Sequence, residues 1–434
     1  MKEADLPVRS ISDAAARIAA GRLTSSALLE ASLDRIAKQD EAVRAWASID
    51  EAGARAAARE RDEEGRAGRA RGPLHGIPVA IKDIFHVAGL TTTCGAAPAF
   101  HVRPTEDAVA VARLRAAGAV IVGKAHTTEF AYFEPGPTRN PWNRAHTPGG
   151  SSSGSAAAVA AGMVPLALGT QTVGSVLRPA AYCGVVGFKG TYGLIPTDGV
   201  VPLAWSFDHV GVFARRVADV ALALDALAAA PLPRREPRPP RLGLAPELLE
   251  RASPEVAERV RETAARLAHA GATVQEVALP PSFAGVHAAG RTVLEVEAAA
   301  YHEELYRVHA AQYRPRTREL IAAGLTSSAV AYARAQRARL AFRRDVMPQF
   351  AACDAWLSPT APTPAPEGFA TGDPWFCAPW SFAGLPAISL PIGVSPLGLP
   401  HAIQLVGAAH RDAEILAVAA WCERVVGFEG APPS

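Results

Sequence analysis

Short apolar runs alternate along this chain with amphipathic helical segments, and this alternation limits the fold more than any other feature. Residues 76–85, GIPVAIKDIF, have the pattern of a short apolar strand that ends in a charged pair. Residues 110–125 have the pattern of a helix, a stop at Gly118 and a second strand. Because the order helix–strand–helix–strand recurs, the sequence predicts an α/β fold in which helices pack on a central sheet.

A proline- and arginine-rich segment, residues 231–240, divides the chain into two parts, and the same alternation resumes beyond it. The next strand is followed by a helix for which Ser253 is the expected N-cap and Pro254 a first-turn residue. Residues from about 285 to 350 are mainly helical in pattern, and two strands and a helix close the chain. We therefore predict a single domain over residues 1–434 with a mainly helical insertion at about 285–350.

The composition excludes several classes of protein. The 434 residues are 49% hydrophobic, which is enough for a large core, and 44 basic against 42 acidic residues give a net charge of +2. Such a balance argues against a nucleic-acid-binding or membrane-binding surface. The five cysteines are odd in number and too far apart for a zinc knuckle, and the first ten residues have no signal-peptide pattern. We expect a cytoplasmic protein without a metal or cofactor.

Two short motifs match known catalytic patterns but lack the context that those patterns need. Residues 150–154, GSSSG, fit the G-x-S-x-G turn of serine hydrolases, but the preceding TRNPWNRAHTPG is a loop pattern and not a strand. Residues 118–124 resemble a phosphate-binding loop, but Ala125 follows instead of Ser or Thr, and the intervening AVIV is a strand pattern. We therefore assign neither the hydrolase turn to the first motif nor phosphate binding to the second.

Three other stretches combine small residues with side chains that can carry chemistry. Lys82 ends an apolar strand, where a lysine either extends to solvent or is desolvated with a lowered pKa. The serines of residues 151–155 open an alanine-rich helix, where N-capping is the simplest role. Ser175 lies between a strand and a helix, in a turn whose backbone amides can converge on one point. The residues alone leave open both a nucleophile beside an oxyanion hole and an ordinary capped turn.

Taken together, these stretches resemble the amidase signature family, which is marked by a glycine- and serine-rich block. The block here runs from GGSSSGSAAAV at residues 149–159 to GTQT and SVLRPAAYCG within residues 169–184. The likeness extends over nearly the whole chain, through TEFAY, NPWN, GVVGFKGTYGLIP, FDHVG, LSPTAPTPAP, FAGLPAISLP and IQLVG. Within the family, the block is most similar to that of malonamidase-type members.

This resemblance implies both a fold and a reaction. The fold is the amidase signature fold, a large twisted mixed sheet covered by helices on both faces. The reaction is hydrolysis of a small or medium carboxamide through a Ser–cisSer–Lys triad and an acyl-enzyme. Ser175 would be the nucleophile and Lys82 the base, and Ser151, after a cis peptide bond to Gly150, would carry the proton between them. The oxyanion hole would be formed by backbone amides of the turn, at Thr172, Val173 and Gly174.

The sequence departs from the common family pattern at three positions of the block. Gln171 stands where most members have aspartate, Leu177 where most have arginine, and Val173 where most have glycine. If position 173 requires a positive φ, the valine would be strained. An arginine follows at Arg178, where the resemblance to malonamidase-type members implies a clamp for a substrate carboxylate such as that of malonamate. A structural salt bridge is the alternative role for Arg178.

Two other functions remain open from the sequence. The same fold occurs in a subunit of tRNA-dependent amidotransferases, although residues 195–211, IPTDGVVPLAWSFDHVG, lack the sequence typical of that subunit. A catalytically weak scaffold protein is the other alternative, and Val173 is its only support. We expect a small-molecule amide as the substrate and neither nucleic acid nor membrane as a partner. A homodimer is one arrangement open to the chain.

Overall fold

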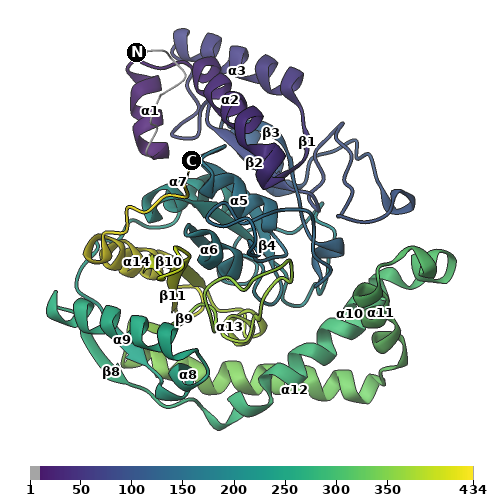
Figure 1. Cartoon of the computed structure of the whole chain (residues 1–434), viewed down its shortest axis with the longest axis vertical. Helices are drawn as coiled ribbons and strands as arrows, with labels where there is room; N and C mark the ends of the chain where they lie inside the picture. Colours follow the sequence, from purple (N-terminus) through teal and green to yellow (C-terminus); the bar gives the residue numbers. More distant parts are fainter. Residues whose placement is uncertain (1–9, 434) are drawn as a thin grey trace.

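The strands of this protein form one mixed sheet. The computed structural model describes residues 10–433, and within them the sheet has the strand order β1-β3-β2-β4-β6-β5-β10-β11-β9-β7-β8 (Figure 1). Strand β2 is parallel to β3 and β4, strand β7 is parallel to β8 and β9, and the other pairings are antiparallel. The strands are β1 (Trp46–Ile49), β2 (Pro78–Lys82), β3 (Val120–Ala125), β4 (Leu166–Gln171), β5 (Val186–Lys189), β6 (His209–Ala214), β7 (Arg241–Leu244), β8 (Thr273–Glu276), β9 (Ala355–Pro359), β10 (Ala387–Val394) and β11 (Pro400–Val406).

Helices follow most of the strands, as the alternation in the sequence predicts. They are α1 (Ile11–Ala19), α2 (Ser25–Val43), α3 (Glu51–Arg66), α4 (Val109–Ala116), α5 (Ser153–Ala160), α6 (Leu177–Cys183), α7 (Val217–Leu227), α8 (Pro246–Glu250), α9 (Pro254–His269), α10 (Val286–His309), α11 (Pro315–Thr326), α12 (Ala329–Val346), α13 (Ala378–Phe382) and α14 (Asp412–Val426). None of the described helices has the length and hydropathy needed to cross a membrane.

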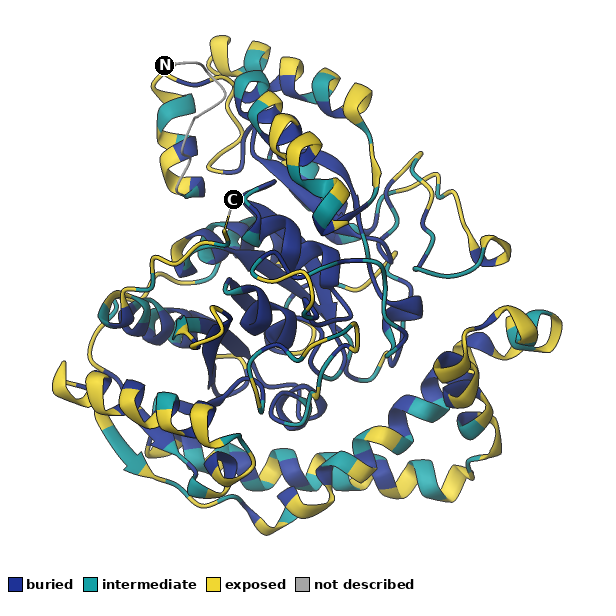
Figure 2. Cartoon of the chain, viewed as in Figure 1, coloured by how far each residue is buried: buried dark blue, intermediate teal, exposed yellow. Residues whose placement is uncertain are grey.

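Alternate residues of the central strands belong to two separate apolar clusters. In β4, Leu166 and Leu168 belong to one cluster and Ala167 to the other. The first cluster includes residues of α4, α7, α9 and α14, and the second includes residues of α2, α3, α5 and α6. Because side chains alternate across a strand, the two clusters lie on opposite faces of the sheet. This confirms the predicted mixed α/β sheet with helices on both faces, and Figure 2 shows its central part as buried.

The starts of two helices test the predicted caps. Ser253 caps α9 with its side chain, and Pro254 is the first residue of that helix, as predicted. Capping of α5 by the serine run is wrong, because its N-cap residue, Ser152, makes no side-chain cap. Instead, the hydroxyls of Ser152 and Ser155 donate to carbonyls of β4 at 3.2 and 2.8 Å. These serines therefore join α5 to the neighbouring strand.

The second half of the chain adds strands to the same sheet and a group of long helices. Residues 231–240 contain neither helix nor strand, and β7 and β8 beyond them join the sheet of the first half. Helices α10, α11 and α12 occupy most of residues 286–346. Figure 1 shows them extending along one side of the molecule, and Figure 2 shows much of their outer surface as exposed.

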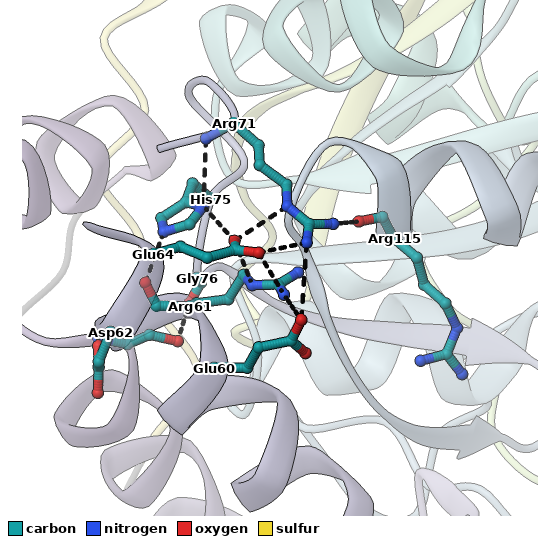
Figure 3. A network of polar contacts seen from close by, with 9 residues as sticks. Glu60, Arg61, Asp62, Glu64, Arg71, His75, Gly76 and Arg115 are labelled. Atoms are coloured by element: carbon teal, nitrogen blue, oxygen red, sulfur yellow. Dashed lines mark hydrogen bonds and ion pairs between the residues drawn. The ribbon is translucent and has the colours of Figure 1, made fainter. Parts of the chain in front are cut away.

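A network of polar contacts holds α3 against the segment that leads into β2 (Figure 3). Glu64 accepts hydrogen bonds from Arg71, and its carboxylate lies 2.9 Å from Nε of Arg61. The His75 ring contacts the Arg61 carbonyl at 2.8 Å. The guanidinium of Arg71 holds the pKa of Glu64 below its usual value. The network orients the chain directly before β2, the strand that ends at Lys82.

Candidate active site

Lys82 is the last residue of β2 and is fully buried. Its Nζ atom lies 2.7 Å from Ser151 Oγ and 2.7 Å from Thr170 Oγ1. Burial lowers the pKa of Lys82 well below its ordinary value, because an ammonium ion loses its hydration in the interior. Of the two alternatives that the sequence left open, the lysine is desolvated and does not extend to solvent. A lysine in this state can act as a base.

Ser151 lies in the turn before α5 and is buried. The peptide bond between Gly150 and Ser151 is cis. The carbonyl of Gly150 accepts a hydrogen bond from Nη2 of Arg178 at 2.7 Å, and that of Ser151 accepts one from the Thr128 amide at 3.2 Å. A side chain at position 150 would meet Thr371 at 2.9 Å. The backbone that carries Ser151 is therefore held from several sides.

Ser175 lies in the turn between β4 and α6, and it is the most accessible of the three predicted triad residues at 7% exposure. Its carbonyl accepts a hydrogen bond from the Ser152 amide at 3.4 Å, which places it beside the turn that carries Ser151. The backbone amides of residues 172–175 donate to no other described residue. A turn with several free amides next to a hydroxyl can hold an oxyanion.

Gln171 lies directly before the turn with the free amides, and its side chain contacts the two amides that follow this turn. Its Oε1 atom accepts hydrogen bonds at 2.9 Å from the amides of Val176 and Leu177, at the start of α6. Its Nε2 atom donates to Ser381 Oγ at 2.8 Å, and that hydroxyl lies 3.3 Å from the carbonyl of Val173. We call Gln171 and Ser381 the loop clip, because together they hold both ends of the turn around Ser175. The sequence marked Gln171 only as a departure from the family pattern.

Val173 and Gly174 show which side chains the backbone of this turn allows. Val173 is not among the described non-glycine residues with a positive φ, so the strain considered from the sequence is absent. Gly174 has a steric requirement instead, because a Cβ atom there would lie 2.9 Å from the Cβ of Pro374. The valine is therefore compatible with the turn, and the glycine at 174 is needed for close packing against Pro374.

Arg178 is buried and bridges two loops of the site. Its Nη2 atom donates to the carbonyl of Gly150 and its Nη1 atom to that of Gly372, both at 2.7 Å. The Cζ atom lies 5.6 Å from the centre of the Phe133 ring, and the buried Nε atom has no partner among the described residues. The structural salt bridge considered from the sequence is wrong, because both partners are backbone carbonyls.

Two polar residues near the site were missed from the sequence. Thr170 contacts Lys82, as described above, and Asp208 accepts a hydrogen bond from Thr172 Oγ1. Thr170, Thr172 and Asp208 line a small cavity of about 30 Å³. The two-residue spacing of the threonines at a strand end is a signal that they share a face. A larger cavity of about 440 Å³, between residues 235–240 and α14, shares no lining residue with it.

Other features of the described chain bear on cofactors. The five cysteines are buried and free. No group of three or more His, Cys, Asp or Glu side chains that could hold a metal ion occurs within residues 10–433. The groups that the site itself brings together are hydroxyls, one lysine and backbone amides.

Comparisons with known proteins place the chain among amide-cleaving enzymes and their relatives. A family model described as Amidase matches residues 27–416. A relative from Roseiflexus castenholzii, named as a glutamyl-tRNA(Gln) amidotransferase subunit, is 38% identical over 98% of this chain and 97% of its own. A crystal structure described as an amidase is 35% identical with a TM-score of 0.90, and covers 96% of this chain and 99% of its own. The peptide amidase of Stenotrophomonas maltophilia is 33% identical with a TM-score of 0.86, over 99% of both chains.

Proposed function

This chain belongs to the amidase family and is an enzyme that hydrolyses amide bonds, and from that premise we propose that it is a free-standing amidohydrolase. Its substrate would be a small or medium carboxamide, cleaved to a carboxylate and ammonia or an amine. The observation that carries the proposal is the contact of 2.7 Å between buried Lys82 and Ser151, beside a turn of free amides that holds Ser175.

The proposed reaction moves one proton in each direction through Ser151. Neutral Lys82 takes the proton of Ser151 while Ser151 takes that of Ser175, whose oxygen attacks the amide carbon. The amides of residues 172–175 donate to the oxyanion of the tetrahedral intermediate. When the C–N bond breaks, Ser151 returns a proton to the leaving amine and is reprotonated by Lys82. Water then attacks the acyl-enzyme by the same route and releases Ser175.

A covalent probe tests the nucleophile directly. We expect a fluorophosphonate to add once to the purified protein, with the modified peptide containing Ser175, and an amide screen with ammonia detection to find a turned-over substrate. Ser175→Ala should give neither an adduct nor ammonia. The matched control is Ser153→Ala in the same serine-rich block, because Ser153 has only a weak contact to the His126 carbonyl at 3.5 Å. An unlabelled, inactive and folded wild-type protein would identify a scaffold instead.

The relative named as a glutamyl-tRNA(Gln) amidotransferase subunit supports a second candidate function. In that case the chain would release ammonia from an amide for a partner protein. The experiment is to measure glutaminase activity of this chain alone and with the partner subunits of such a complex. Hydrolysis of other amides without any partner favours the free-standing enzyme, whereas glutamine hydrolysis that requires the partners favours the amidotransferase role.

The substrate class is the finer part of the proposal, and it depends on Arg178. We propose that a good substrate has a carboxylate near the scissile amide, as malonamate does. The support is a buried guanidinium that has only neutral partners and one Nε atom without any. Asp373 is close enough to act on the charge of Arg178 but forms no ion pair with it. A substrate carboxylate would therefore be the first charged hydrogen-bond partner of this guanidinium.

Arg178→Leu is expected to raise KM for malonamate roughly 10- to 100-fold more than for a neutral amide of similar size, since a hydrogen bond to a charged group is lost. Both substrates should also lose kcat, because Arg178 holds the Gly150 carbonyl. The measurement is therefore the ratio of the two kinetic losses and not either one alone. Equal losses for both amides would mean that Arg178 only positions the Gly150–Ser151 turn.

A further inference from the structure

The carboxylate of Asp208 is bound by three hydrogen-bond donors. The amides of Leu203 and Ala204 donate to Oδ2 at 2.8 and 2.9 Å, and the hydroxyl of Thr172 donates to Oδ1. An ionised carboxylate only accepts hydrogen bonds, and all three partners of Asp208 are donors. This arrangement therefore favours the ionised form of Asp208. Asp208 thus brings a negative charge to the edge of the site.

The register of the sheet places this charge next to the turn that carries Ser175. Strands β4 and β6 pair antiparallel with Gln171 opposite His209, so the next residues, Thr172 and Asp208, also lie opposite each other. Thr170 and Asp208 line the same cavity of about 30 Å³, and Thr170 contacts Lys82. Asp208 and Lys82 are therefore near each other without forming a direct ion pair.

The other titratable groups around Lys82 and Asp208 do not compete for this role. Asp83 is paired with Lys124 at 2.7 Å. Burial raises the pKa of the Cys94 thiol and of the Tyr192 phenol, so both stay neutral at neutral pH. Burial also lowers the pKa of His209, which lines the cavity and is neutral as well. Asp208 is thus the charged group near Lys82 that has no basic partner of its own within residues 10–433.

We propose that Asp208 is a positioning residue of the proton relay, whose carboxylate stabilises Lys82 after Lys82 has taken the proton that starts at Ser175. Before the transfer Lys82 is neutral and gains little from a nearby charge. After it, the fully buried ammonium and the half-buried carboxylate attract each other more strongly than two charges in bulk water would. An interaction that is stronger after proton transfer than before it lowers the barrier to acylation.

This inference rests on the proposed function, and the electrostatics of the two groups agree with it. Burial is the main cause of the low pKa of Lys82, and the charge of Asp208 acts in the opposite direction by raising it. Burial also raises the pKa of Asp208, while the charge of Lys82 lowers it. Each group thus favours the charged form of the other.

The test is the pH dependence of kcat/KM for wild type and Asp208→Asn on one amide. Wild-type activity should fall toward acid as Lys82 is protonated. Removing the carboxylate lowers the pKa of Lys82, so the acid limb of Asp208→Asn should move about one pH unit toward acid. The plateau should fall by up to about tenfold, because the loss of one pKa unit of ammonium stabilisation corresponds to a factor of ten. Thr172→Val removes one of the three donors to the carboxylate and keeps the two amide donors. Its acid limb should stay in place, and only the position of the limb is compared, because Thr172 belongs to the oxyanion turn.

The outcomes separate this inference from the proposed function. A folded Asp208→Asn protein with a lower plateau but an unmoved acid limb, or a limb moved toward alkali, would overturn the inference, since Asp208 would then only shape the turn. Asp208→Ser removes the same charge with a smaller side chain and serves as the test if Asp208→Asn does not fold. Wild-type protein that hydrolyses none of the amides in the screen would refute the proposed function itself.

Discussion

Replacing Lys82 by alanine is expected to lower kcat/KM for amide hydrolysis roughly 10³- to 10⁶-fold, because the base of a proton relay and the activation of its nucleophile are lost together. Ser151→Ala should cost about as much, since Ser151 Oγ lies 2.7 Å from the amine and is the proposed path to Ser175. The double variant Lys82→Ala/Ser151→Ala should be little worse than either single variant, because residues that act as one unit show non-additive losses.

The measurement is steady-state kinetics of the two single variants, the double variant and Ser153→Ala on one substrate. Ser153→Ala removes a hydroxyl from the same block and should stay close to the wild-type rate. Circular dichroism and thermal melts show whether each variant is folded. Losses that multiply in the double variant would mean that Lys82 and Ser151 act independently, and the relay would then be wrong.

Gln171→Leu is expected to lower kcat about 10²- to 10³-fold with a much smaller change in KM, because free amides that are displaced no longer stabilise the oxyanion. Leucine is similar in size but cannot accept from the amides of Val176 and Leu177 or donate to Ser381, the contacts that Gln171 makes now. Without the loop clip, the turn loses the bonds that keep its ends in place.

Two further variants distinguish positioning of the oxyanion-binding turn by Gln171 from an effect of Gln171 on the stability of the whole protein. Gln171→Glu keeps the acceptor for both amides and can accept from Ser381, so it should recover part of the lost kcat. Ser381→Ala keeps the bonds of Gln171 to the helix start and removes the partner of Gln171 Nε2 together with the support of the Val173 carbonyl, so its loss should be smaller. A Gln171→Leu protein that is folded and has wild-type kcat would show that the turn holds its shape without the clip.

Local sequence patterns correctly predicted those helix ends and strands that are determined by neighbouring residues. The N-cap at Ser253 with Pro254 after it follows from the backbone amides of one helix end. The strand that ends at Lys82 follows from a short apolar run. The serines of α5 were wrongly predicted as caps, because their partners are carbonyls of a strand that comes later in the chain.

The site depends on contacts that no local pattern contains. Thr170, Asp208 and Ser381 were not predicted to have a role. For Arg178, the salt bridge is wrong because its guanidinium donates to two carbonyls, whereas binding of a substrate carboxylate stays a prediction. Val173 was considered strained because its backbone angles were unknown, and the structure shows no positive φ there. In each case the deciding neighbour lies in another element of the fold.

By itself, the sequence determined the class of fold, the order of its elements and the family. The reason is that apolar spacing, helix caps and the glycine- and serine-rich block are local patterns of neighbouring residues. The sequence also named Lys82, Ser151 and Ser175, through the resemblance and not through local physics. Only the tertiary structure decided that the Lys82 side chain is desolvated and in contact with Ser151 and Thr170, which lie 69 and 88 residues further along the chain. The physical reason is that burial and hydrogen-bond partners depend on which strands become neighbours in the sheet, and strand order is a property of the whole fold.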